Sequence, residues 1–123
     1  MKLFLGVTDT EWYSFLKEEK ADEVNFWQPS GGVGFRALPM GGPFLFKLKA
    51  PYNAIAGVGW FASYSVLPLS VAWRYFRRKN GLATFEELQQ KIIGYRKDNQ
   101  PNPQIGCIGL TDPVFFERED WLP

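Results

Sequence analysis

The sequence contains no histidine, a single cysteine and no long apolar run. Without histidine, a Ser-His-Asp triad, a Cys-His pair and every histidine-bearing metal site are excluded within this chain. The single cysteine, Cys107, excludes an internal disulfide and a multi-cysteine zinc site, and it makes a reducing, cytoplasmic setting the default expectation. No apolar stretch approaches the roughly 20 residues that cross a bilayer, so no membrane partner is expected.

Aromatic side chains, in contrast, are abundant. Five Trp, five Tyr and eleven Phe make up 17% of the 123 residues. Each buries about 150–250 Å², so a domain of this size has difficulty placing all of them in one core, and some are expected to line a groove or pocket. Charge is nearly balanced, with 14 basic and 13 acidic residues. This balance argues against a uniformly basic surface but permits a local basic patch.

Length and patterning predict a single domain over residues 1–123 with an α+β fold. Three helices are expected, one ending near Lys20, one opening at Pro68-Leu69-Ser70 and ending in Arg77-Arg78-Lys79, and one carrying Phe85 to Tyr95. A curled antiparallel sheet or small barrel flanked by these helices is the expected architecture. The predicted strands are Lys2–Val7, Glu23–Trp27, Phe35–Leu38, Phe44–Lys49, the stretch Ala54–Tyr64, and Gln104–Leu110, which turns at Thr111-Asp112-Pro113 into Val114-Phe115-Phe116.

Signals of catalysis are weak. Gly31-Gly32-Val33-Gly34 is followed by a predicted strand rather than a helix, so a mobile loop beside a binding surface is expected instead of a nucleotide-phosphate loop. Cys107 lies in an apolar strand without a histidine or cation to activate it. Carboxylate pairs fall on exposed positions, and an acid-dependent hydrolase would have to perform all proton transfer with them. We therefore predict no catalytic activity, no metal site and no cofactor for this chain.

The most distinctive segment is a strand that ends in Trp27 and passes into a polar, glycine-rich loop. An aromatic ring beside amide and hydroxyl groups is suited to stack on a nucleic-acid base and to hydrogen-bond its edge. The alternative is that these aromatics form an ordinary core. The candidate base-pocket residues are Trp27, Asn25, Gln28, Ser30, Trp60, Tyr64 and Ser65.

A basic cluster follows on the second predicted helix. Arg74, Arg77 and Arg78 are spaced to share one helical face. A few cations suffice to contact phosphates, although a solvated helix end would look the same. The candidate phosphate-binding residues are Arg36, Arg74, Arg77, Arg78 and Lys79.

Several of these segments together resemble the N-terminal region of bacterial restriction-type HNH endonucleases. The resemblance spans essentially the whole chain. It is carried by Asn25–Pro29, Phe35–Leu38, Gly42–Lys49, Asn53–Phe61, Ser65–Trp73 and Ile105–Ile108. The HNH motif itself requires histidine, so the cutting domain is absent from this sequence.

The layout of these segments is also similar to the PUA superfamily, which includes the EVE, YTH, ASCH and SRA domains. This resemblance implies a PUA-like barrel that holds a modified base of double-stranded DNA in an aromatic pocket by base flipping. The expected function is then modification-dependent restriction, in which this reader directs a fused HNH nuclease. A protein-interaction or dimerisation domain that reads no base, including a homodimer, stays open as the alternative.

Overall fold

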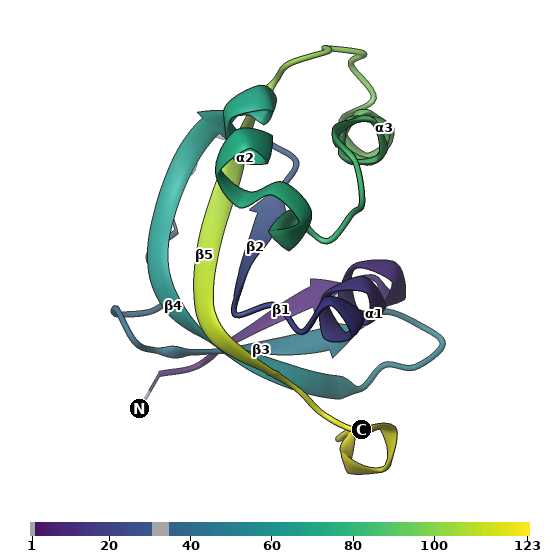
Figure 1. Cartoon of the computed structure of the whole chain (residues 1–123). Helices are drawn as coiled ribbons and strands as arrows, with labels where there is room; N and C mark the ends of the chain where they lie inside the picture. Colours follow the sequence, from purple (N-terminus) through teal and green to yellow (C-terminus); the bar gives the residue numbers. More distant parts are fainter. Residues whose placement is uncertain (1, 31–34) are drawn as a thin grey trace.

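One five-stranded sheet forms the centre of the molecule, a computed structural model that describes residues 2–30 and 35–123 (Figure 1). The strand order is β1-β3-β4-β5-β2. β1 pairs parallel with β3, and the other neighbouring strands pair antiparallel. The strands are β1 (Phe4–Thr8), β2 (Glu23–Gln28), β3 (Pro43–Leu48), β4 (Ile55–Pro68) and β5 (Gln104–Phe115).

Three α-helices flank this sheet. They are α1 (Thr10–Glu19), α2 (Leu69–Phe76) and α3 (Phe85–Arg96), with short 3₁₀ turns η1 (Arg77–Asn80) and η2 (Arg118–Asp120). In Figure 1, α2 and α3 lie at one end of the long strands β4 and β5, and α1 lies nearer the other end. The predicted α+β architecture with three flanking helices is confirmed. No helix in the described part of the chain is long and apolar enough to span a bilayer.

The sheet curls strongly but does not close into a barrel. The edge strands β1 and β2 approach each other at Gly6, where an added Cβ would lie 2.9 Å from Cζ of Phe26 and would overlap Phe44. Only glycine allows this approach. Because β1 and β2 do not pair, an opening is left between them. The mixed, open sheet refines the prediction of an antiparallel barrel.

Two buried clusters fill the space around the sheet. The larger one packs α1 residues Trp12, Tyr13 and Leu16 against Phe44 and Phe46 on the concave face. The smaller cluster joins α2 and α3 to the opposite face of β5. Its buried members are Leu69, Ala72, Phe76, Leu88, Ile92, Ile105 and Cys107. The expectation that Cys107 is a buried apolar residue is therefore confirmed.

Two predicted boundaries differ from the structure. Residues 35–38 form no strand, because Phe35 instead packs its ring against Phe4 and Phe61, which sets the local backbone. The last strand continues through the predicted turn, with Asp112 at φ 48° and its N–H bonded to the carbonyl of Asp22. The predicted loop Gly31–Gly34 lies outside the described residues.

Candidate functional site

A cavity of about 160 Å³ lies at the opening between β1 and β2. Cavities of roughly 150 Å³ admit a benzene ring, so this one has room for a single planar ring. Its walls come from the ends of three strands, the start of α1 and the end of α3. They are formed by Val7, Thr8, Asp9, Trp12, Phe26, Trp27, Pro29, Lys49 and Tyr95.

Aromatic rings provide much of the cavity wall. The rings of Trp27 and Tyr95 are 6.0 Å apart at 62°, and those of Trp12 and Phe26 are 5.3 Å apart at 73°. Both indoles are fixed by hydrogen bonds. Trp27 Nε1 donates to the carbonyl of Asn80 at 2.9 Å, and Trp12 Nε1 donates to the carbonyl of Asn25 at 3.3 Å. The rings are thus held in place before any ligand arrives.

An ammonium group lies at the rim of the cavity. Lys49 Nζ donates to the hydroxyl of Tyr95 at 2.9 Å and lies 5.0 Å from the centre of that ring. Among the described residues, no carboxylate lies within ion-pair distance of Lys49. Its positive charge is therefore available to an anionic or carbonyl-bearing ligand.

The carboxylate of the cavity, by contrast, is already occupied. Asp9 caps α1 by accepting from the N–H of Trp12 at 2.7 Å, and its other oxygen lies 3.0 Å from Lys91 Nζ. The pair also joins α1 to α3. The negative charge of Asp9 is compensated by its ion pair with Lys91, whereas the positive charge of Lys49 has no carboxylate partner among the described residues. The cavity therefore favours ligands with negative or electron-rich groups.

The end of α3 is attached to the loop that follows β2. Arg96 Nη1 donates to the carbonyl of Pro29 at 3.0 Å. Together with the Lys91–Asp9 pair, this bond holds α3 over the opening, where Tyr95 forms one wall. The cavity therefore depends on contacts between segments far apart in the sequence.

Trp27 is the member of the predicted base pocket that lines this cavity. Asn25 is fully buried behind it, and its Nδ2 donates to Oδ1 of Asn80 at 2.9 Å. Its own Oδ1 has no hydrogen-bond partner in the described structure. Asn25 therefore supports the fold around Trp27 and is closed to a ligand.

The remaining predicted pocket residues lie elsewhere. Gln28 and Tyr64 meet over Gly106, where an added Cβ would lie 2.8 Å from Gln28 Oε1 and 3.0 Å from the Tyr64 hydroxyl. Trp60 on β4 is paired with Pro43 on β3 and with Thr111 on β5, and it does not line the cavity. Ser65 on β4 is paired with Cys107 on β5. Ser30 is exposed after β2. The structure does not bring these residues together with Trp27 in one cavity.

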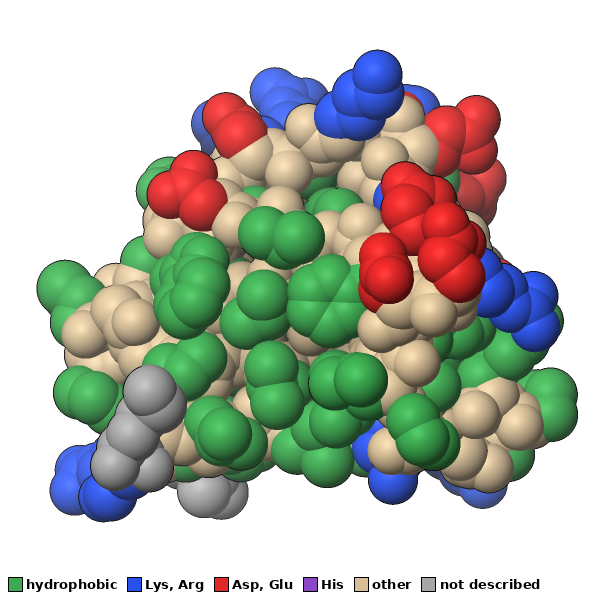
Figure 2. Space-filling view, turned by 90° about the horizontal axis from the view of Figure 1, so that it is seen from below, with side chains coloured by type: hydrophobic (Ala, Val, Ile, Leu, Met, Phe, Trp, Pro, Cys, Tyr) green, Lys and Arg blue, Asp and Glu red, His purple; other side chains and the backbone are tan. Residues whose placement is uncertain are grey.

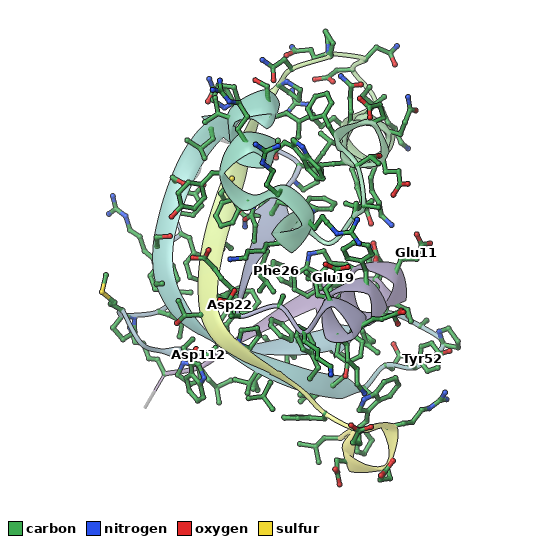
Figure 3. All side chains as sticks on the ribbon, viewed as in Figure 1. Glu11, Glu19, Asp22, Phe26, Tyr52 and Asp112 are labelled. Atoms are coloured by element: carbon green, nitrogen blue, oxygen red, sulfur yellow. The ribbon has the colours of Figure 1, made fainter. Side chains whose placement is uncertain are left out.

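The basic cluster has a different geometry from the predicted one. Arg74, Arg77 and Arg78 do not share one helical face, because α2 ends at Phe76 and Arg77 adopts φ 51° at the start of η1. Arg78 Nε donates to Glu19 Oε2 at 3.1 Å, and Lys79 lies 3.0 Å from Asp22; both acidic residues are labelled in Figure 3. These cations hold the pKa of the Glu19 and Asp22 carboxyls below their usual values.

Arg36, Arg74 and Arg77 are exposed, and no ion pair to them is found among the described residues. They remain available to phosphates, whereas Arg78 and Lys79 already link η1 to α1 and to the start of β2. None of the predicted phosphate-binding residues lines the cavity that holds Trp27.

Sequence reasoning did not identify Lys49 and Tyr95 as site residues. Lys49 is the last residue of a predicted strand and Tyr95 lies on the apolar stripe of a predicted helix, so each fits an ordinary role. A usable signal was the alternation of Phe46, Lys47, Leu48 and Lys49, which places a lysine at the strand end. Lys49 becomes part of a cavity because α3 brings Tyr95 against it, a contact between segments far apart in the sequence.

Comparison with known proteins identifies solved structures with a similar fold. The sequence matches no family model and no curated protein. The structure is similar to the crystal structure of ASCH from Zymomonas mobilis, with a TM-score of 0.62 and 9% identity over 96% of this chain and 90% of that chain. A Tyr-to-Phe variant of ASCH from the same organism matches with a TM-score of 0.63 and 11% identity over 94% and 76%.

At these identities the likeness concerns the fold alone. ASCH domains belong to the PUA-like superfamily. The chain therefore shares the α+β fold of these ASCH structures, in agreement with the fold that the resemblance to the PUA superfamily implied.

Proposed function

We propose that this chain is a nucleic-acid-binding domain that takes one base, extruded from a DNA duplex, into the cavity between β1, β2 and α3. The observation that carries the proposal is the cavity itself. It has the volume of one planar ring, aromatic walls that include Trp27 and Tyr95, and the uncompensated ammonium of Lys49 at its rim.

Energetics support such an arrangement. Extruding a base costs a few kcal/mol, and stacking on an aromatic side chain returns about 1–3 kcal/mol per base. Trp27 is held in place by Asn80, so little conformational entropy is lost when a base stacks on it. Lys49 adds attraction for a base carbonyl or for the flanking phosphate.

The selected base carries a modification, and the domain directs a nuclease to it. This part of the proposal rests on the resemblance to the N-terminal region of HNH endonucleases. Double-stranded DNA with a modified base is the proposed partner, and a fused HNH nuclease is the proposed effector. In this proposal the effector performs catalysis and this domain supplies the binding.

A binding screen tests the proposal. Labelled duplexes that carry one methylated, hydroxymethylated or glucosylated cytosine or one methyladenine are compared with the unmodified duplex and with RNA. We expect tighter binding to one modified DNA duplex. Lys49→Ala and Tyr95→Ala should each weaken that binding by roughly 5- to 100-fold.

Lys97→Ala is the matched control, because Lys97 is an exposed lysine beside Tyr95 that does not line the cavity. It should change affinity only slightly, and about equally for modified and unmodified duplexes. Equal binding to every duplex by the wild-type chain would overturn base selection. Tighter binding to RNA would replace the proposed partner.

A further inference from the structure

An apolar surface covers the outer face of β1 and β3 and of the parts of β4 and β5 paired around Val58 and Val114, opposite the concave core. The register places Leu5, Leu45, Val58 and Val114 side by side across β1, β3, β4 and β5. With Val7, Trp60 and Leu122 they form what we call the outer patch. In Figure 2 hydrophobic side chains occupy the middle of this face, and charged side chains lie mainly around its edge.

The outer patch is more exposed than a core face of a sheet would be. Leu5, Val7, Trp60, Val114 and Leu122 are each 37–54% exposed. A large apolar side chain presents on the order of 200 Å², so these five present about 500 Å², and the half-buried Leu45 and Val58 add to it. An apolar area of this size matches the largest patch found on a typical soluble monomer, and such patches are often functional.

We infer that the outer patch is the interface of a symmetric homodimer. Its area approaches the roughly 600–1,000 Å² that each partner buries in a standard protein interface. A second copy offers the same largely apolar surface, and two sheet faces pack well against each other at about 10 Å. An isologous contact of this kind closes after two copies.

The low charge of the outer patch favours a second copy of the chain as the partner over nucleic acid or an anionic membrane. Lys47 is in register with the outer patch, and the exposed Asp112 lies on β5 between Thr111, the partner of Trp60, and Val114, the partner of Val58, so these positions carry one cation and one anion. Nucleic acid and anionic membranes would require several cations here. The outer patch adjoins the cavity that contains Trp27 at Val7, so the variants chosen below are at residues that do not line this cavity.

Sedimentation velocity of the full chain over a 100-fold concentration range tests the inference. The wild-type chain should shift from 14.1 kDa to twice that mass as concentration rises. Val114→Glu should weaken dimerisation by at least 10-fold, because it buries a carboxylate in an apolar contact. Leu5→Lys, on an edge strand that tolerates lysine, should do the same.

Val71→Glu is the matched control, since Val71 is 40% exposed on α2, away from the outer patch. It should leave the dimer unchanged. Circular dichroism confirms that each variant is folded. A wild-type chain that stays monomeric over the whole concentration range overturns the inference. The outer patch would then be assigned to the binding of a different protein. A dimer that persists in folded Val114→Glu and Leu5→Lys also overturns the inference.

Discussion

The buried amides of Asn25 and Asn80 are hydrogen-bonded to each other, with Asn25 Nδ2 2.9 Å from Asn80 Oδ1. The bond connects β2 to η1. Asn80 also donates to the carbonyls of Ala72 and Arg77, and its own carbonyl accepts from the indole of Trp27. One asparagine thus terminates α2 and fixes the ring that forms the cavity wall.

We therefore predict that Asn80→Ala destabilises the fold. The substitution leaves the buried Asn25 amide and the carbonyls of Ala72 and Arg77 without their partner, at about 2–4 kcal/mol in the free energy of unfolding. Urea denaturation measures this value. Gln100→Ala, at an exposed position, serves as the control and should change it by less than about 0.5 kcal/mol. A similarly small effect of Asn80→Ala would contradict this role.

Two glycine-to-alanine substitutions should act in opposite directions. At Gly6 an added Cβ overlaps Phe44 and presses on Phe26, so Gly6→Ala should lower the free energy of unfolding by about 1–3 kcal/mol or more. At Gly94, within α3, nothing lies within 4 Å. Gly94→Ala should raise stability by up to about 1 kcal/mol through helix propensity. Thermal denaturation of both variants distinguishes these outcomes, and equal effects would show that the β1–β2 approach is not close.

Cys107 should be unreactive in the native state. Burial raises the pKa of its thiol, and the neighbouring Asn25 amide lowers it by less. Because the thiolate is the reactive form, a thiol reagent at pH 8 should modify Cys107 only after denaturant is added. Rapid labelling without denaturant would show that the contact between β5 and the helices α2 and α3 opens easily.

The two kinds of arginine near α2 should differ in DNA binding. Arg77 is exposed without an ion pair in the described structure, whereas Arg78 is bonded to Glu19. If Arg77 contacts a phosphate, Arg77→Ala should weaken all duplexes about equally and reduce the slope of log affinity against log salt by about 1. Arg78→Ala should reduce that slope less. Identical slopes for both variants and the wild type would remove this surface from the DNA interface.

Local patterns in the sequence predicted the helices well. All three predicted helices form, with the side chains of Asp9 and Thr84 as the N-caps of α1 and α3, and the strand pattern is right over β1, β2 and β3. The open edge between β1 and β2 was not predictable, because it depends on long-range packing at Gly6.

The candidate site, like the fold, was predictable where neighbouring residues determine it and not where contacts between distant segments do. Trp27 was identifiable from its polar neighbours, and it does line a cavity. Asn25 lies two residues before Trp27 on β2, so the two side chains are on the same face of the strand. The helices cover this face at Asn25, and its side chain is therefore buried inside the fold. Tyr95 joins the cavity through the Lys91 and Arg96 contacts, which no local pattern encodes.

The indole N–H signal of Trp27 in ¹⁵N NMR spectra tests the central claim most directly. The chain has five tryptophans, and the Trp27 signal is identified by its loss in Trp27→Phe. Titration with the preferred modified duplex should shift this signal strongly, because a stacked base adds a ring current, whereas the unmodified duplex should shift it little. A Trp27 signal that stays in place while the duplex binds and other tryptophan signals move would contradict the account.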